Sequence, residues 1–253
     1  MELNPFTARE FFHAAALKHL AVRLAGRAWA LKGGVCLRLF HGSARLSEDM
    51  DLDVDPGMRL ETLERGVDAV LASGALKSEL VRGGLSVART SKPKQIETTQ
   101  RWKVELELAG EKVQTKVEFS RRRERPPAAR GMPEAALLDR YSLTDFGAQY
   151  YEAGEMALQK LAALAADNRA AVRDLYDLDH LWRRRKEPVA AAVAQAEGGL
   201  RNAAAVKAEG FAWKDFQGQV LPYLEPEART AYDAAAFARL KEALARRLRG
   251  ATE

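Results

Sequence analysis

Cysteine and long apolar runs are what this sequence lacks most clearly. Cys36 is the single cysteine among 253 residues, which excludes an intramolecular disulfide and a cysteine-based zinc site. Arg9, Glu10 and Lys18 interrupt the apolar pattern of the N-terminal segment, which therefore resembles neither a signal peptide nor a membrane span. The sequence also shows no internal repeat. We expect a cytoplasmic protein, and nothing in the pattern demands more than a monomer.

The composition is that of a folded, basic protein. Apolar residues make up 47% of the chain and charged residues 30%, which is typical of a globular protein of one large or two ordinary domains. The net charge is +5, and such a surface attracts polyanions. Its basic clusters are Arg121, Arg122, Arg123 and Arg125; the run from Arg183 to Lys186; and Arg246, Arg247 and Arg249. Each of them is equally well explained as a solvated helix end or loop.

The hydrophobic periodicity changes along the chain and predicts two parts. A capping box at Thr7 to Glu10 predicts a first helix, with Gly26 as a stop, and residues 59–71 form a second helical pattern. From about Leu80 the pattern alternates, and AGE between the last two alternating runs indicates a hairpin. A proline-rich break follows at residues 121–133, and the rest is alanine-rich and helical. We therefore predict an α+β fold with a mixed sheet at 1–130 and an all-α domain at 134–253.

Four acids alternate with apolar residues in SEDMDLDVD: Asp49, Asp51, Asp53 and Asp55. In a strand they project from one face about 6 to 7 Å apart. At an effective dielectric constant of 20, each neighbouring pair repels by about 2.5 kcal/mol. Such a row is tolerable only if it faces water or if cations neutralise it.

This acid row has the residue types of a two-metal site for phosphoryl or nucleotidyl transfer. Paired carboxylates bind Mg²⁺, and a third acid on a neighbouring strand completes a two-metal arrangement. Glu118 is the candidate third acid, with Glu105 and Glu107 as rivals, although each residue alone is more readily explained as an ordinary glutamate on a strand surface. Gly33-Gly34 before a short helix offers backbone N–H groups to a phosphate, or is simply a turn.

Two segments together resemble a known family. The first contains Lys32-Gly33-Gly34 and then the pattern R-x-S-x-D-x-D, and the second is QKLAALAADNRAAVRDLYDLD. The first segment contains Arg45, Ser47, Asp49 and Asp51. The second contains Lys160, Arg169, Arg173, Asp174 and Asp177. The match resembles the AbiEii-type nucleotidyltransferase toxins of type IV toxin–antitoxin systems, within the polymerase-β-like nucleotidyltransferase superfamily. It covers roughly residues 30–55 and 155–180.

The resemblance implies roles for these residues. Asp49, Asp51 and Glu118 would bind metal, whereas the broader superfamily pattern would choose Asp51 and Asp53. Lys160 would neutralise the triphosphate, and Asp174 would be needed for activity. Nucleotide binding would fall to Lys32, Gly33, Gly34, Arg45, Ser47 and Arg169.

Geometry adds a condition on the second segment. Lys160 and Asp174 would lie about 21 Å apart on one continuous helix. If both serve one site, the chain must turn near residues 166–168, where Asp167 or Asn168 would cap the next helix. Asp174 and Asp177 would then share a face.

The implied activity is the transfer of NMP from an NTP, with CTP and GTP not distinguished, using Mg²⁺ or Mn²⁺. The resemblance makes an RNA acceptor, the 3′ end of tRNA, the first expectation, with a block of translation as the result. A cognate antitoxin encoded nearby would be the protein partner, and no membrane partner is expected. The alternatives are a module that binds nucleotide or RNA without transfer, and transfer to a protein or a small molecule.

Overall fold

The computed structural model describes residues 3–24, 27–121, 128–168 and 171–250. It divides into a sheet unit, Met1–Gly42 with Leu46–Tyr151, and a helical unit, Ser43–Arg45 with Glu152–Glu253. The sequence placed the boundary at 130–134, about twenty residues earlier. The difference arises because residues 129–150 supply two more strands of the sheet.

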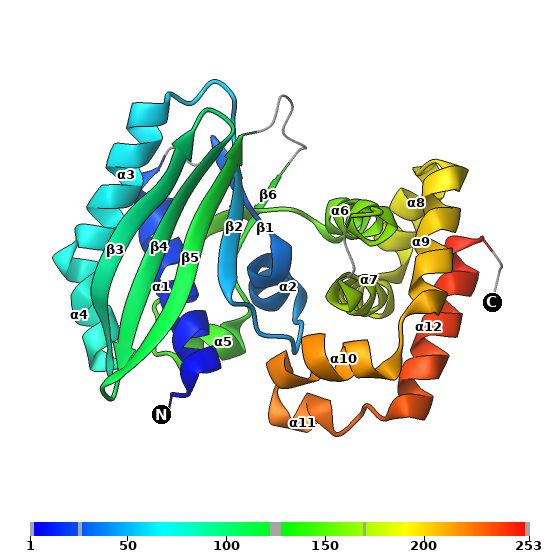
Figure 1. The fold of residues 1–253 in the computed structure, drawn as a ribbon. Coiled ribbons are helices and arrows are strands. Elements are labelled where there is room, and N and C mark those ends of the chain that lie inside the picture. Colours follow the sequence, from blue (N-terminus) through cyan, green and yellow to red (C-terminus); the bar gives the residue numbers. More distant parts are fainter. Residues whose placement is uncertain (1–2, 25–26, 122–127, 169–170, 251–253) are drawn as a thin grey trace. The chain divides into compact units, whose positions relative to one another are not determined.

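The sheet unit contains a seven-stranded mixed sheet in the order β3-β4-β5-β2-β1-β7-β6 (Figure 1). β2 is parallel to β5 and β1 is parallel to β7, whereas the other neighbours are antiparallel. This confirms the predicted fold class. The strands are β1 Trp29–Lys32, β2 Asp49–Val54, β3 Leu85–Ile96, β4 Thr99–Leu108, β5 Glu111–Arg121, β6 Ala129–Gly131 and β7 Ala148–Tyr150.

The predicted hairpin joins β4 to β5. Ala109 and Gly110 form its turn, with φ values of 50° and 86°. Positive φ at both central residues is the requirement of the tight turn that matches strand twist. The turn sets the register that runs from Leu108 opposite Glu111 to Thr99 opposite Ser120. It therefore decides which side chains of β4 and β5 share a face.

Five helices accompany the sheet: α1 Pro5–Arg23, α2 Gly33–His41, α3 Leu60–Ala72, α4 Gly74–Arg82 and α5 Ala135–Arg140. α1, α3 and α4 lie behind β3 to β5 in Figure 1 and cover that face of the sheet. Trp102, Val104 and Leu106 of β4 are buried on this side. The cap predicted at Thr7 was wrong: Asn4 is the N-cap, and Thr7 is the N3 residue that completes the box. Pro5 at the first helical position favours this earlier start.

The helical unit consists of α6 Ala153–Ala165, α7 Val172–Arg184, α8 Lys186–Gln195, α9 Gly198–Gly210, α10 Trp213–Gln219, α11 Pro226–Arg229 and α12 Ala234–Leu248. A short 3₁₀ turn, Leu221–Tyr223, separates α10 from α11. Phe216 contacts the rings of Tyr176, Trp213, Tyr232 and Phe237 and forms the centre of an aromatic core. Across the described parts of both units, no helix combines the length and apolarity needed to cross a membrane.

The chain turns where the sequence required a turn, because α6 ends at Ala165 and α7 begins at Val172. The expected caps were wrong, since Ala171 precedes α7 and neither Asp167 nor Asn168 does. Gly26, Arg169 and the basic and proline-rich residues at 122–127 lie outside the described residues.

Candidate active site

The acid row lies on β2, between β1 and β5. Met50, Leu52 and Val54 are completely buried on the helix-covered side of the sheet. Their burial fixes the register, because a slip of one residue would drive three carboxylates into the core. The acids consequently project from the opposite face, where Asp51 pairs across the strands with Lys32 of β1 and Glu118 of β5. Glu118 is thus the acid beside the pair, whereas the rivals Glu105 and Glu107 stand one strand further away on β4.

Three acids of this face are held by basic side chains. Asp49 Oδ2 lies 3.0 Å from Nζ of Lys116, and Glu118 Oε2 accepts a bond of 2.5 Å from Arg101 Nε. Asp53 is fully buried and accepts bonds from Lys32 Nζ at 2.5 Å and from the Tyr151 hydroxyl at 3.0 Å. Cations therefore neutralise Asp49 and Asp53, two of the four acids in the row.

Asp51 differs from its neighbours. Its carboxylate makes no hydrogen bond or ion pair with any described side chain. Burial is the largest cause and raises the pKa of Asp51; the charges of Lys32 and Lys116 lower it, and the charges of Asp49 and Glu118 raise it. A carboxylate whose ionised form is this poorly compensated is a ready ligand for a cation.

Gly33 brings the start of α2 against this carboxylate. Its φ is +70°, and a Cβ atom at this position would lie 3.0 Å from Asp51 Oδ2. Glycine is therefore required both for the backbone conformation and for the close approach. The turn at Lys32-Gly33-Gly34 thus joins β1 to α2 directly beside the acid pair.

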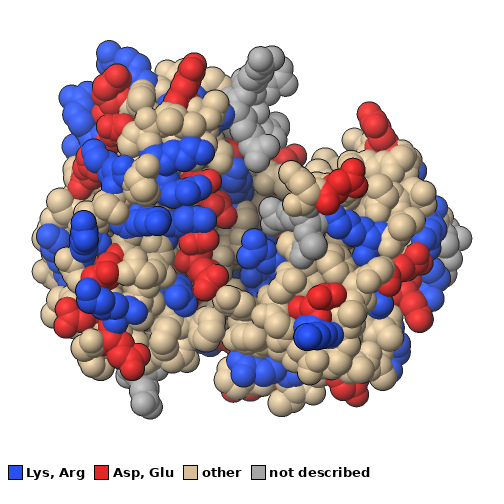
Figure 2. Space-filling model, in the orientation of Figure 1, with Lys and Arg blue, Asp and Glu red and all other residues tan. Residues whose placement is uncertain are grey.

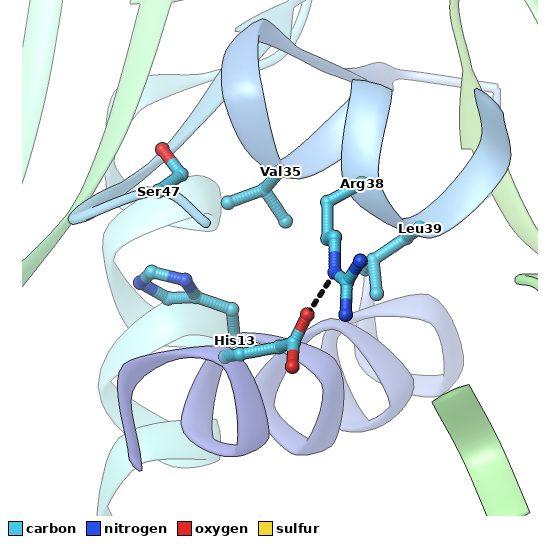
Figure 3. Close-up of a pocket in the computed structure, with 6 residues that line it drawn as sticks. His13, Val35, Arg38, Leu39 and Ser47 are labelled. Carbon is cyan, nitrogen blue, oxygen red and sulfur yellow. Dashed lines mark hydrogen bonds and ion pairs between the residues drawn. The ribbon is translucent and has the colours of Figure 1, made fainter. Parts of the chain in front are cut away.

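Ser47 stabilises the entry to β2. Its hydroxyl donates to the backbone oxygen of Asp49 at 3.1 Å. The residue also lines a small pocket in the sheet unit, where an ion pair links Arg38 to a carboxylate of α1 (Figure 3). The pocket is lined by Glu10, His13, Val35, Arg38, Leu39 and Ser47. Burial lowers the pKa of His13 to about 3, with the charge of Arg9 a smaller cause, so its imidazole is neutral and bonds Thr115 at 2.7 Å.

A second group of predicted residues forms a buried cluster inside the helical unit. Lys160 of α6 lies 2.9 Å from Asp174 Oδ1 and 2.7 Å from Asp177 Oδ2 of α7. Arg45 donates two bonds of 2.8 Å to Asp177 in a bidentate pair. Burial would raise the pKa of Asp177, but the charges and hydrogen bonds of Arg45 and Lys160 outweigh it and hold that pKa below its ordinary value. We call these four residues the buried ion cluster.

The structure thus places the predicted residues in two groups, one in each unit. Asp49, Asp51, Glu118, Lys32, Gly33, Gly34 and Ser47 belong to the sheet unit, and Arg45, Lys160 and Asp174 to the helical unit. Lys32 and Arg45 already donate to buried carboxylates, so nucleotide binding by these two residues stays a prediction. Sequence reasoning missed Arg101 and Lys116 as partners of the acids. The hairpin pairing of β4 with β5 would have revealed Arg101 opposite Glu118, whereas Lys116 stands opposite Asp49 only through the pairing of β2 with β5.

The donor set fits a divalent ion held together with a substrate. Within the described parts of the chain, no three His, Cys, Asp or Glu residues converge as a complete metal site. Mg²⁺ however commonly takes only one or two carboxylates and completes its shell with water and substrate phosphates. Asp49 and Asp51 can provide two, and the observation that fits is that Asp51 bonds to no described side chain.

Comparison with known proteins agrees with this chemistry. The model of the nucleotidyl transferase AbiEii toxin family, type IV toxin–antitoxin system, matches residues 15–248. Among solved structures, JHP933 from Helicobacter pylori matches with a TM-score of 0.66 and 18% identity, over 99% of this chain and 94% of that one. A nucleotidyltransferase candidate of H. pylori matches with a TM-score of 0.63 and 18% identity over the full length of both chains. Among curated proteins no match was found.

Proposed function

This chain belongs to the AbiEii family of nucleotidyltransferase toxins. From that premise we propose that it transfers NMP from an NTP to the 3′ end of an RNA acceptor, and that this acceptor is tRNA. Membership makes it a nucleotidyltransferase of a toxin–antitoxin system with an antitoxin partner. The proposal adds the divalent ion, the acceptor and a block of translation as the outcome. The observation that carries it is Asp51, a carboxylate that bonds to no residue in the described parts of the chain and lies beside Asp49 and Glu118.

The side chains of the sheet unit can be assigned roles in this reaction. Asp49 and Asp51 would hold Mg²⁺ or Mn²⁺, which supplies charge neutralisation for the triphosphate. Glu118 Oε1 has no partner among the described residues, and we assign it to accept the proton of the attacking hydroxyl. That hydroxyl oxygen then bonds to the α-phosphorus of the NTP, and pyrophosphate leaves. The backbone N–H groups of Gly33 and Gly34, at the N-terminus of α2, suit a phosphate.

The helical unit provides the proposed triphosphate cation. Lys160 uses two of its three protons on Asp174 and Asp177, and its third has no described partner. A compact ammonium ion of this kind suits a phosphate oxygen. Asp174, fully buried, would orient Lys160 through their bond of 2.9 Å. Arg169, which the resemblance also assigns to nucleotide binding, remains a prediction.

The direct test is transfer of label to RNA. The protein is incubated with each α-labelled NTP, Mg²⁺ and total tRNA, and the RNA is resolved on a gel. Asp51→Asn should reduce transfer at least about 100-fold, because losing a metal ligand removes several kcal/mol of transition-state stabilisation. Asp145→Asn is the matched control, since Asp145 is an exposed carboxylate without a described partner. No labelled tRNA with any NTP, or equal activity of wild type and Asp51→Asn, would refute the proposal.

A further inference from the structure

The strands β3, β4 and β5 present one face that no described helix of the sheet unit covers (Figure 1). We call this the open face, and it carries the side chains that alternate with the buried Trp102, Val104 and Leu106. Figure 2 shows several Lys and Arg side chains side by side over these strands, with a column of acidic side chains next to them. Its cations are Arg89, Lys94, Arg101, Lys103, Lys112 and Lys116, and its acids are Glu105, Glu107 and Glu118.

The strand register concentrates the positive charge next to the acid pair. Lys116 of β5 stands opposite Lys103 of β4, and Arg101 of β4 stands opposite Lys94 of β3. The same two rows of the sheet continue into β2 as Asp49 and Asp51. Like charges directly opposite one another destabilise a sheet, so these two cation pairs cost folding free energy. An anion bound across them would remove that cost.

Two of these cations are already engaged and two are not. Lys116 pairs with Asp49, and Arg101 pairs with Glu118. Lys103 and Lys94 have no hydrogen bond or ion pair with a described residue. The neighbouring row is balanced instead, because Glu105 binds both Lys112 and Gln114. Among the described strands of the open face, the cations that stand opposite other cations therefore lie in the two rows that lead to the acid pair.

The chemistry of the open face favours a phosphate backbone over bases. Aromatic side chains of its described strands, such as Trp102 and Phe119, point into the core and not onto this face. Without stacking platforms a surface cannot hold bases by their rings. Flexible lysines instead contact phosphates as point charges and carry no sequence information. Strands lie about 4.8 Å apart, so the row from Asp51 to Lys94 spans about 14 Å.

We infer that the open face binds the sugar-phosphate backbone of the RNA acceptor just before its reacting end, with Lys103 and Lys94 as phosphate contacts. The inference rests on the proposed function, because it places the acceptor of that reaction. It predicts binding that is insensitive to sequence and strongly dependent on salt. An acidic protein is the alternative ligand for the open face, and the experiment represents it by poly-glutamate.

The test measures binding of a fluorescein-labelled single-stranded RNA by anisotropy, without NTP. The variant is Lys94→Gln/Lys103→Gln, and the control is Lys77→Gln/Lys214→Gln, which removes two exposed lysines from α4 and α10. Two lost phosphate contacts should weaken binding roughly 10- to 50-fold at low salt and reduce the slope of log Kd against log salt by about 1.4. The control should bind as the wild type does. Lys103→Arg, which keeps the charge, should retain binding and guards against a folding defect.

The outcomes separate this inference from the proposed function. A higher KM for tRNA with an unchanged kcat in the double variant, together with weaker binding, supports the inference. Transfer to tRNA by the wild type with unaltered RNA binding by the variant overturns the inference and leaves the function standing. No RNA binding and no transfer by the wild type overturns both. The inference is also overturned if the control variant loses as much RNA affinity as Lys94→Gln/Lys103→Gln does. It is likewise overturned if poly-glutamate displaces RNA from the wild type and from the variant at the same concentration.

Discussion

Asp51 and Asp53 project from the same face of β2 but meet opposite surroundings. Asp53 is buried beneath Lys32 and Tyr151, and both of its oxygens are bonded. Asp51 is bonded to neither Lys32 nor Lys116, and burial together with two neighbouring acids raises its pKa. Asp53 is therefore bonded within the fold, whereas Asp51 is the carboxylate that we propose for the cation. This contrast favours Asp49 and Asp51 over Asp51 and Asp53 as the metal pair.

Replacing Asp51 should leave the metal-free protein as stable as the wild type or more stable. The unfolded chain releases the Asp51 proton near 3.8, whereas the native protein releases it at a higher pH. The contribution of Asp51 to the free energy of unfolding therefore falls as the pH rises from about 4 through the native pKa. Asparagine at this position does not ionise, so it removes this loss of unfolding free energy. Urea unfolding at neutral pH should show an unchanged or larger free energy of unfolding for Asp51→Asn.

The same pair of proteins reports on the metal. Mg²⁺ or Mn²⁺ should raise the Tm of the wild type, because a ligand that binds only the native state stabilises it. The Tm of Asp51→Asn should not change. Chelation should stop transfer without unfolding the wild type. A metal-free Asp51→Asn that is clearly less stable than the wild type would show that Asp51 has a structural partner.

Asp49 and Asp53 should separate activity from stability. Asp53→Asn leaves Lys32 as a buried charge without its carboxylate, which should lower the free energy of unfolding by about 3 kcal/mol. The side chain of Asp49 is 36% exposed and pairs with that of Lys116, which is 31% exposed, so Asp49→Asn should cost less than about 1 kcal/mol. Asp49→Asn should abolish transfer, whereas Asp53→Asn should keep more activity per folded molecule than Asp49→Asn does. Denaturant titrations measure the stability of both variants, and transfer assays measure their activity. A greater loss of activity in Asp53→Asn than in Asp49→Asn would favour Asp51 and Asp53 as the metal pair.

Among the elements, long periodic segments were predictable and short ones were not. The acid strand, the hairpin and the helix at Leu60–Ala72 follow from alternation or helical spacing. β6 and β7 have three residues each, too few to show a period, and the sheet creates them by pairing. The choice between Glu118 and its rivals depended on which strand lies beside β2. Pairing of β2 with β5 is a long-range contact that no local pattern contains.

The buried ion cluster makes Arg45 essential to α6 and α7. Arg45→Met would leave Asp177 buried with Lys160 as its remaining cation, which should lower the free energy of unfolding by about 3 to 5 kcal/mol at neutral pH. Because the pKa of Asp177 is lowered in the native state, its stabilisation is complete above the ordinary value of 3.8 and is lost only as the pH falls well below it. The variant should therefore also unfold at a higher pH than the wild type.

Urea and acid unfolding followed by the fluorescence of Trp182 and Trp213, both in the helical unit, measure this effect. The control is Arg184→Met, which removes an exposed arginine from the end of α7 and should change stability by less than about 0.5 kcal/mol. Similar effects of the two substitutions would mean that the bidentate pair of Arg45 and Asp177 contributes no stability.

On the scale of the whole molecule, the chain enters the helical unit twice. Ser43–Arg45 belongs to that unit, although Gly42 before it and Leu46 after it belong to the sheet unit. The short segment is fastened by the bridge of Arg45 to Leu224 and by a bond of 3.1 Å from Glu225 N to Ala44 O. The helical unit is therefore completed by residues that lie more than a hundred positions earlier in the sequence. Its integrity depends on the part of the chain that carries the signature motif.

This dependence predicts that the C-terminal fragment 152–253 will not fold properly alone. Without Arg45 the fully buried carboxylate of Asp177 would lose its bidentate partner, at a cost of several kcal/mol. Circular dichroism should show a weak, non-cooperative thermal transition, and Asp177→Leu, which removes the surplus buried charge, should sharpen it. Co-expression with fragment 1–151 should restore a cooperative transition, but not when that fragment carries Arg45→Met. Cooperative unfolding of 152–253 by itself, at the Tm of the full chain, would contradict the role of Arg45 in completing the helical unit.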